Sequence, residues 1–458
     1  MKNIAVFPID NRPVCYDLLK MIASLDKTNC VFTPDISLLG DLKNRANVEA
    51  LFSWFEKIES VDIVVVSLDT IAYGGLVSSR RCNDDIDEIK NRINRFFDIV
   101  KKKSAKVYAF SSIMRISNNN VNEEEKEYWK DYGQKIFEYS YNLHKLGLSK
   151  NELISDIPQD ILDDYFSTRE RNFEINKYYI EIKKQGLIDT LVFSKDDCAE
   201  YGLNVKEANE LSLLSADEKN ILVKTGADEI PLSLLSRALN DDKKIKVAPI
   251  YTNWESVDKI SKYEDISVKE SVESQIEICG GAVSDYENCD LVLLVNNFKN
   301  QQGELVMNVF EPLFEDDLPL IDKPFFVADI LNANGADNKF IEKLLNKSFD
   351  NFYGYAGWNT TGNTLGSVIS ASLTYFNALD RDKEKFDNLQ IIRFLDDWAY
   401  QANVRAEIRN DNANLQNDVI AIKMKKFEDI ILDKFNRNNA KFKYSYPWNR
   451  FFEIRIDF

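Results

Sequence analysis

Histidine is almost absent from this sequence: His144 is the only one among 458 residues. A Ser–His–Asp triad, a histidine zinc site or a histidine general base would each depend on that single residue. It lies in a stretch with the apolar spacing of an amphipathic helix, where an ordinary surface histidine is expected. We therefore expect acid–base chemistry to be carried by carboxylates.

Basic residues are fewer than acidic ones. Lys and Arg total 58 against 75 Asp and Glu, which gives a formal net charge of −17. This balance argues against nucleic acid or an anionic membrane surface as a partner, because both attract cationic patches. No apolar run approaches the ~18 residues that a membrane span needs, and the first residues show no secretory leader.

Metal and cofactor motifs are missing too. The six cysteines contain no C-x-x-C pair, so we expect reduced thiols and a cytoplasmic protein. No G-x-G-x-x-G follows a predicted strand, the Lys-[Ser/Thr] ending of a P-loop is absent, and no G-x-S-x-G elbow occurs. The sequence predicts no bound cofactor and no metal, and it disfavours a serine hydrolase.

The sequence does contain a regular alternation of short apolar runs and helical patterns. Residues 61–68 and 290–295 are apolar almost throughout, as in parallel strands that helices cover on both faces. The alternation predicts an α/β fold. We expect a (β/α)8 TIM-barrel-like catalytic domain over residues 1–379, with a helical insertion at about 122–186, and a C-terminal helical extension over 380–458. The alternative is an open doubly wound sheet, which could divide into two lobes.

Acids, amides and aromatic side chains follow the expected strands. Because the carboxyl ends of parallel strands converge on one face, we expect these side chains to line one pocket. The competing interpretation is that Asp and Asn favour turns and helix N-caps and that Trp belongs in cores. The predicted substrate-binding residues are Asp10, Arg12, Asp69, Tyr73, Asp228, Glu229, Asn253, Trp254, Asn297, Asp329, Asn332, Trp358, Asn359 and Asn363.

The predicted catalytic residues are Asp196 and Asp197, which are adjacent at the end of an expected strand. A close carboxylate pair pushes the two pKa values apart, so that one acid holds a proton while the other is ionised. Cleavage of a glycosidic bond requires such a division of roles. Asp10, Asp69, Asp197 and Asp329 could instead bind a hard cation such as magnesium or calcium, although the EF-hand pattern is missing.

These motifs resemble a bacterial family known as domain of unknown function 4127. The resemblance runs from residue 8 to about 453 and implies no particular activity. The matching phrases are Pro-Ile-Asp-Asn-Arg-Pro-Val at 8–14, Leu-Asp-Thr-Ile-Ala-Tyr-Gly-Gly-Leu-Val-Ser-Ser-Arg at 68–80, Lys-Asp-Asp-Cys-Ala-Glu-Tyr-Gly at 195–202, Gly-Ala-Asp-Glu at 226–229, Asn-Ala-Asn-Gly-Ala-Asp at 332–337, Tyr-Ala-Gly-Trp-Asn-Thr-Thr-Gly-Asn-Thr-Leu-Gly at 355–366 and Pro-Trp-Asn-Arg at 447–450.

The order of polar strand ends is also similar to that of the O-GlcNAcase-like β-N-acetylglucosaminidases. That similarity implies that Asp196 orients the acetamido group of the substrate, which is the nucleophile, and that Asp197 is the general acid/base. It also implies sugar-binding amides, at Asn297, Asn332 and Asn359. The sequence departs from that family at the lysine before the acid pair, and the family's usual tyrosine partner is not identifiable.

The sequence therefore predicts a glycoside hydrolase that uses the Asp-Asp pair, with N-acetylhexosaminides as one candidate substrate class. The expected partner is a small carbohydrate or glycoside, and homo-oligomer formation is left open. One alternative is a metal-assisted hydrolase or lyase of a small polar metabolite. A second alternative is a carbohydrate-binding protein without catalytic activity.

Overall fold

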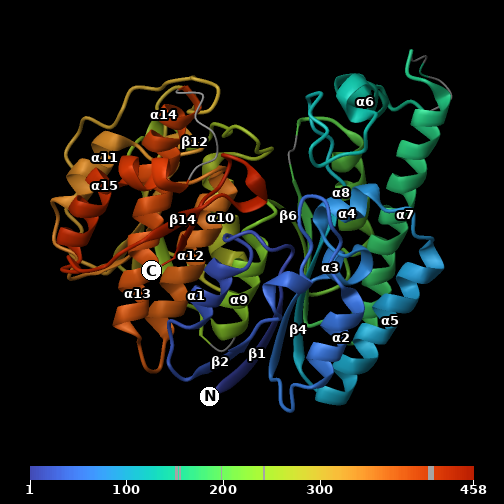
Figure 1. Cartoon of the computed structure of the whole chain (residues 1–458), viewed down its shortest axis with the longest axis horizontal. Helices are drawn as coiled ribbons and strands as arrows, with labels where there is room; N and C mark the ends of the chain where they lie inside the picture. Colours follow the sequence, from blue (N-terminus) through green and yellow to red (C-terminus); the bar gives the residue numbers. More distant parts are fainter. Residues whose placement is uncertain (150–152, 154–155, 197–198, 241–242, 411–416, 458) are drawn as a thin grey trace. The chain divides into compact units, whose positions relative to one another are not determined.

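A computed structural model of the protein describes residues 1–149, 153, 156–196, 199–240, 243–410 and 417–457 (Figure 1). The chain forms two compact units, which we call the first unit and the second unit. The first unit is Met1–Asn11 with Asn29–Pro231, and the second is Arg12–Thr28 with Leu232–Phe458. This division differs from the expected one, because residues 380–458 belong to the second unit. The predicted catalytic residue Asp197 lies outside the described residues.

The first unit is built on a six-stranded parallel sheet with the order β2-β1-β3-β4-β5-β6. Its strand β3 reads Ile-Val-Val-Val-Ser and is buried along its whole length. β-branched side chains such as these favour strands, and a parallel strand is covered by helices on both faces. The strands are β1 (Lys2–Phe7), β2 (Asn29–Phe32), β3 (Ile63–Ser67), β4 (Lys106–Ile113), β5 (Thr190–Lys195) and β6 (Ile221–Thr225).

Helices occupy the connections of the first unit. The connection from β4 to β5 contains the predicted helical insertion, and its helices have an apolar cluster around Trp129, Ile136 and Tyr165. The helices are α2 (Val48–Glu56), α3 (Leu68–Tyr73), α4 (Leu76–Arg81), α5 (Ile86–Lys103), α6 (Trp129–Leu146), α7 (Gln159–Lys184) and α8 (Leu203–Leu214). Helix α9 (Ile230–Asn240) begins at the end of this unit.

The second unit is built on a five-stranded parallel sheet with the order β13-β11-β9-β7-β8. Its strands are β7 (Lys246–Tyr251), β8 (Ala282–Val283), β9 (Leu291–Asn296), β11 (Phe325–Asp329) and β13 (Phe352–Ala356). Two short pairs accompany it: β10 (Gly303–Glu304) with β12 (Asn332–Ala333), and β14 (Lys443–Ser445) with β15 (Arg455–Asp457).

The helices of the second unit come from both ends of the chain. They are α1 (Asp17–Ala23), α10 (Val268–Ile278), α11 (Asn338–Leu345), α12 (Thr361–Asn377), α13 (Lys383–Arg393), the π-helix η3 (Phe394–Val404), α14 (Arg405–Asn410) and α15 (Asn417–Lys434). Helix α12 is buried along almost its whole length and lies against β11 and β13.

The two sheets repeat one strand order. Numbered along the chain, β8-β7-β9-β11-β13 reads 2-1-3-4-5, and the first sheet begins with the same sequence of strands. The α/β prediction is confirmed, but closure into a barrel is not. A barrel adds each strand on the same side of the last, whereas here β2 and β3 lie on opposite sides of β1. Each sheet therefore stays open.

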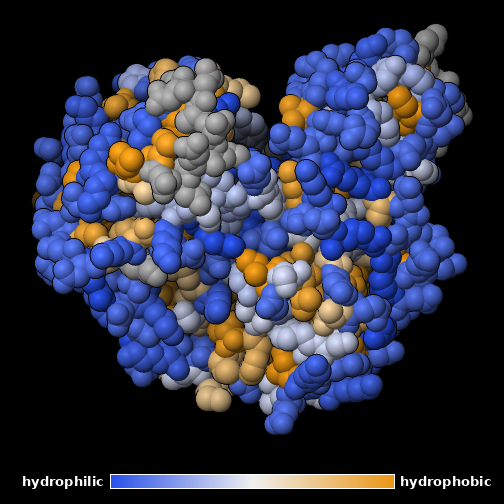
Figure 2. All heavy atoms as spheres, viewed as in Figure 1, coloured by the Kyte–Doolittle hydropathy of each residue, from blue (hydrophilic) through white to orange (hydrophobic). Residues whose placement is uncertain are grey.

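The face of each unit seen in Figure 2 is mostly polar. Hydrophilic residues predominate on the visible face of each unit, with scattered apolar patches between them (Figure 2). Among the described residues, no helix combines the length and apolar character needed to cross a membrane.

Candidate functional site

Ligand sites in open α/β sheets form beside the carboxyl ends of the strands where the strand order reverses. In the first sheet this point lies between β1 and β3, which lead to Asp10 and Asp69. The hydroxyl of Thr70 donates to the carbonyl of Pro8 at 2.7 Å and so ties the two loops together. Asp10 and Asp69 are both buried. The sequence therefore places two predicted acids at the expected position in this sheet.

Asp69 is a buried carboxyl that is held against β4. Its Oδ2 accepts a hydrogen bond from the backbone N–H of Ser112 at 2.9 Å. Burial raises the pKa of Asp69 to about 6, and the opposing effects of this hydrogen bond and of the Arg80 charge are smaller. Tyr73, predicted to bind substrate, is instead a buried ring under the guanidinium of Arg171.

Two arginines and two glutamates form a closed ring beside Asp69, which we call the Arg–Glu ring: Arg80, Arg115, Glu124 and Glu125. Oε2 of Glu124 lies 3.3 Å from Nη2 of Arg80 and 3.0 Å from Nη2 of Arg115. Oε1 of Glu125 lies 3.2 Å from Nε of Arg80 and 3.0 Å from Nε of Arg115. One oxygen of each glutamate thus bridges both guanidinium groups.

Asp196 adjoins this ring. Its Oδ2 lies 3.4 Å from Nη1 of Arg115, and its side chain keeps 22% of its exposure. Burial raises the pKa of Asp196, the charge of Arg115 opposes that shift, and the carboxyl of Asp228 adds to it. Among the described residues, Asp228 is the carboxyl whose charge raises the pKa of Asp196 most, and Asp197 lies outside the described residues. A carboxyl pair from two neighbouring strand ends is present in the first unit.

Glu229 has a structural position. Its side chain is fully buried, and Oε2 accepts from the backbone N–H of Ala227 at 3.1 Å. A Cβ on Gly226 would lie only 1.6 Å from Oε1 of Glu229, and Gly226 has a φ of +124° that favours glycine. The carboxylate thus folds back onto its own turn before α9. Glu229 therefore holds the turn before α9 and does not face solvent.

The amides at the corresponding point of the second sheet bind each other. The loops after β7 and β9 meet where backbone N–H of Asn253 donates to Oδ1 of Asn297 at 2.9 Å. In return, Nδ2 of Asn297 donates to the Asn253 carbonyl at 2.9 Å. Trp254, in the short helix η2 (Trp254–Ser256), is 60% exposed and packs edge-on against Tyr251. The amides therefore fix the loops, while the Trp254 ring remains accessible.

The predicted aromatic platform at Trp358 is not accessible. This indole is 3% exposed, and its Nε1 donates to Oγ of Ser367 at 3.1 Å. Its backbone N–H donates to the hydroxyl of Thr364 at 3.0 Å. Trp358 is thus a core residue that fastens β13 to α12, in line with the competing interpretation of tryptophan in the sequence.

A second group of acids is completely buried at the ends of β11 and β13. Asp329 accepts from Nδ2 of Asn296 at 2.9 Å and from the backbone N–H of Asp337 at 2.7 Å. Burial, together with the neighbouring carboxyl of Asp337, raises the pKa of Asp329 to about 8. The hydroxyl of Tyr355 has no hydrogen-bond partner among the described residues, and Asp329 and Asp397 lie close enough to act on its charge.

The remaining predicted amides serve the backbone or are buried. Asn332 lies in β12 and is buried. Asn359 has a φ of 52°, and its carbonyl accepts from the backbone N–H of Asn334 at 2.8 Å. Asn363 is buried in the first turn of α12, and its Oδ1 has no partner among the described residues. Of these three amides, Asn363 retains an acceptor that the described part of the chain does not use.

Comparison with known proteins identifies the family. The family model described as Protein of unknown function (DUF4127) matches residues 4–457. The chain belongs to this family. The resemblance drawn from the sequence motifs is thereby confirmed. Neither the curated proteins nor the solved structures yielded a match.

Two of the DUF4127 motifs meet in the second unit, although they lie at opposite ends of the chain. The guanidinium of Arg12 lies 5.0 Å from the ring centroid of Trp448, and that of Arg450 lies 4.6 Å from it. Glu453 pairs with both arginines, at 3.5 and 3.2 Å. Trp448 and Asn449 have φ values of 55° and 54°, so the backbone is strained where the motifs meet. Arg12 thus anchors the C-terminal segment.

The DUF4127 chain also contains acids that the sequence prediction omitted. Asp396 and Asp397 lie in the 11-residue π-helix η3, and both pair with Arg393, at 2.9 and 3.1 Å. Oδ2 of Asp397 accepts from the backbone N–H of Gly357 at 2.8 Å. π-helices are rare and often occur at functional positions. The sequence feature that could have indicated them is the position of two adjacent acids inside an apolar helical run.

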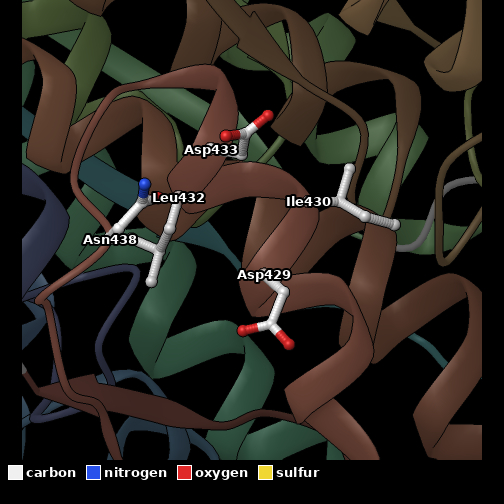
Figure 3. A pocket seen from close by; sticks show the side chains of 5 residues that line it. All are labelled: Asp429, Ile430, Leu432, Asp433 and Asn438. Carbon is white, nitrogen blue, oxygen red and sulfur yellow. The ribbon is translucent and has the colours of Figure 1, made fainter.

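Two surface hollows formed by described residues of this DUF4127 protein lie away from the predicted residues. A groove of about 540 Å³ lies on α15 and the turn after it, between Asp429, Leu432 and Asn438 (Figure 3). A second hollow, of about 330 Å³, is lined by residues that include Arg81 and Tyr128. Within the part of the chain that the structure describes, no three Asp, Glu, Cys or His side chains are grouped as metal ligands.

Proposed function

We propose that this protein is a glycoside hydrolase whose acid–base chemistry is performed by carboxyls at the strand ends of the first unit. The observation that carries the proposal is the ion pair of Asp196 with Arg115 at 3.4 Å, at the end of β5, where the charge of Asp228 also acts on Asp196. Carboxyls whose surroundings separate their pKa values can divide the roles of proton donor and acceptor. Here they would do so without histidine, in agreement with the composition.

In the proposed mechanism, Asp197 donates a proton to the leaving oxygen and later accepts one from water. Asp196, in its ionised form, accepts a hydrogen bond from the acetamido N–H of the substrate. The acetamido carbonyl oxygen then attacks the anomeric carbon as the glycosidic bond breaks, and the proton from Asp197 goes to the departing alcohol. Because burial raises the pKa of Asp196, activity should fall on the acid side as this carboxyl becomes protonated.

The test is a screen of aryl glycosides, including N-acetylhexosaminides, with the purified full-length chain. Asp197→Asn should lower kcat by about 100-fold or more on every accepted substrate, since a positioned general acid contributes roughly that much. The matched control is Asp98→Asn on α5, because the Asp98 side chain is 65% exposed. Unchanged hydrolysis by Asp197→Asn, or no hydrolysis of any glycoside by the unmodified chain, would refute the proposal.

A second candidate function is carbohydrate binding without turnover, which the exposure of Trp254 favours. A flat indole that is 60% exposed offers a face on which a sugar ring can stack. In that case sugars should quench tryptophan fluorescence in a saturable manner, and Trp254→Ala should abolish the effect. Leu320→Ala is the matched control, because Leu320 is an exposed apolar residue of the same unit. Saturable binding without product formation would favour this candidate over the hydrolase.

A further inference from the structure

We infer that the Arg–Glu ring is a positioning device for Asp196, and that Glu124 controls how strongly Arg115 holds that carboxylate. The inference rests on the proposed function, because it explains how one of the proposed catalytic carboxyls is oriented. Arg115 and Glu124 are accordingly positioning residues, which act through Asp196.

The geometry of the ring leaves one edge of Arg115 for Asp196. Nε and Nη2 of Arg115 contact Glu125 and Glu124, both at 3.0 Å, while Nη1 lies 3.4 Å from Oδ2 of Asp196. A guanidinium group is planar, so two fixed contacts determine where its third nitrogen points. The two glutamates thereby set the direction from which Arg115 approaches Asp196.

The ring has a buried half and a more accessible half. The side chains of Arg80 and Glu125 are 2% and 4% exposed. Those of Arg115 and Glu124 are 17% and 18% exposed, close to the 22% of Asp196. The buried half is anchored further, since Nε of Arg80 donates to the Glu124 carbonyl at 3.3 Å. Substitutions in the accessible half can therefore change the contact with Asp196 while the anchor stays in place.

Charge sharing links the ring to the ionisation of Asp196. Among the described residues, the positive charge of Arg115 acts on the carboxylates of Glu124, Glu125 and Asp196. Within the described residues, the charged groups that act most strongly on Asp196 are Arg115 just after β4, Arg80 on α4, Glu124 in the connection after β4 and Asp228 after β6. Neutralising Glu124 removes one competitor for Arg115, so the ionised form of Asp196 becomes more favourable.

A purely stabilising role is a weaker explanation for this arrangement. Replacing a buried ion-pair network by apolar residues is often neutral or stabilising, so such networks add little to folding by themselves. The ring also joins α4, the segment just after β4 and the connection that follows, and through Arg115 it contacts Asp196. Orientation of that carboxyl accounts for both observations.

The experiment follows the titration of Asp196 directly, by ¹³C NMR of carboxyl-labelled aspartate in the full-length chain, with Asp196→Asn used to assign the signal. Glu124→Gln should lower the pKa of Asp196 by about one unit, and Arg115→Gln should raise it by a similar amount. Glu123→Gln is the matched control, because Glu123 is exposed, adjacent in sequence and outside the ring. Arg115→Lys keeps the positive charge but lacks the planar guanidinium group, so it should give a pKa of Asp196 between those of the unmodified chain and Arg115→Gln.

A Glu124→Gln titration identical to that of Glu123→Gln, or a shift to higher pH, would overturn the inference. Activity provides a second readout: the acid limb of kcat/KM should move to lower pH in Glu124→Gln by the same amount as the NMR titration. The NMR measurement does not require turnover. Absence of glycoside hydrolysis would therefore refute the proposed function, whereas an unshifted titration would refute the role of the ring.

Discussion

Gly357 leaves room for a tyrosine hydroxyl, and this makes a quantitative prediction. A Cβ at Gly357 would lie 2.3 Å from Oη of Tyr355 and 3.2 Å from Cβ of Asp329. The Tyr355 ring cannot easily move, because it is buried and stacked on Phe394 with centroids 4.6 Å apart. Gly357→Ala should therefore cost about 3 kcal/mol of unfolding free energy, the upper part of the range for an overpacked core.

Removing the hydroxyl should relieve most of that cost. Tyr355→Phe alone should change stability little, because the hydroxyl has no hydrogen-bond partner among the described residues. In the Tyr355→Phe background the contact at 2.3 Å is gone, and the contacts that remain are with Cζ at 3.1 Å and with Asp329 at 3.2 Å. Gly357→Ala should then cost about 2 kcal/mol less than in the unmodified chain.

The assay is urea unfolding of the four proteins of this double-mutant cycle at one pH, with the coupling energy as the measured quantity. Circular dichroism before unfolding checks that each variant is folded. If Gly357→Ala costs the same with tyrosine as with phenylalanine, the hydroxyl is not the obstacle, and the close approach of β13 to Asp329 must have another cause.

Three further predictions concern buried groups. Burial raises the pKa of Asp329 to about 8 and that of Asp397 to about 7, from the ordinary 3.8 of an aspartate, so the folded chain holds protons that the unfolded chain has released. Each group should thus lower the free energy of unfolding by about 1.4 kcal/mol per pH unit as the pH rises from 4 towards 7; Asp397→Asn should flatten this slope, and an unchanged slope contradicts the prediction. Gly226→Ala should destabilise the chain by about 3 kcal/mol in thermal or urea unfolding, because its Cβ would overlap Glu229 and Gly226 has a φ of +124°; a neutral result would refute this packing of Glu229. Trp358→Phe should lower the free energy of unfolding by about 2 kcal/mol yet leave the affinity for a bound sugar unchanged, since the indole is buried. An altered affinity in calorimetry would show that the indole contacts the sugar.

The α/β class of the fold could be predicted from the sequence, but whether the sheet closes into a barrel could not. Continuous apolar runs such as residues 61–68 identify parallel strands, because both faces of such strands are covered by helices. Strand β3 pairs with β1 on the side away from β2. In a barrel it would pair with β2 instead, and the local sequence does not distinguish these orders because both bury the same side chains. The alternation of strands and helices therefore favoured one barrel, whereas the chain forms two open sheets.

The candidate site could be predicted where strand ends carry acids. Asp69, Asp196 and Asp228 lie in one unit at the edge that parallel strands share. Glu124 and Glu125 could not be found this way, because an acidic run in a helix-like insertion has the pattern of a solvated surface. Asn253 and Asn297 follow strands as expected, but the side-chain amide of each residue donates to the backbone carbonyl of the other.

The assignment of Arg12–Thr28 to the second unit affects the order of folding during synthesis. Helix α1 leaves the ribosome early, yet the helix that it packs against, α12, begins at Thr361. Until then its apolar residues Leu18, Leu19 and Ile22, all buried in the folded chain, lack their cover. A nascent chain that ends at Pro231 should therefore bind chaperones through this segment. Replacing residues 12–28 by a short glycine-rich loop should let the first unit be produced alone.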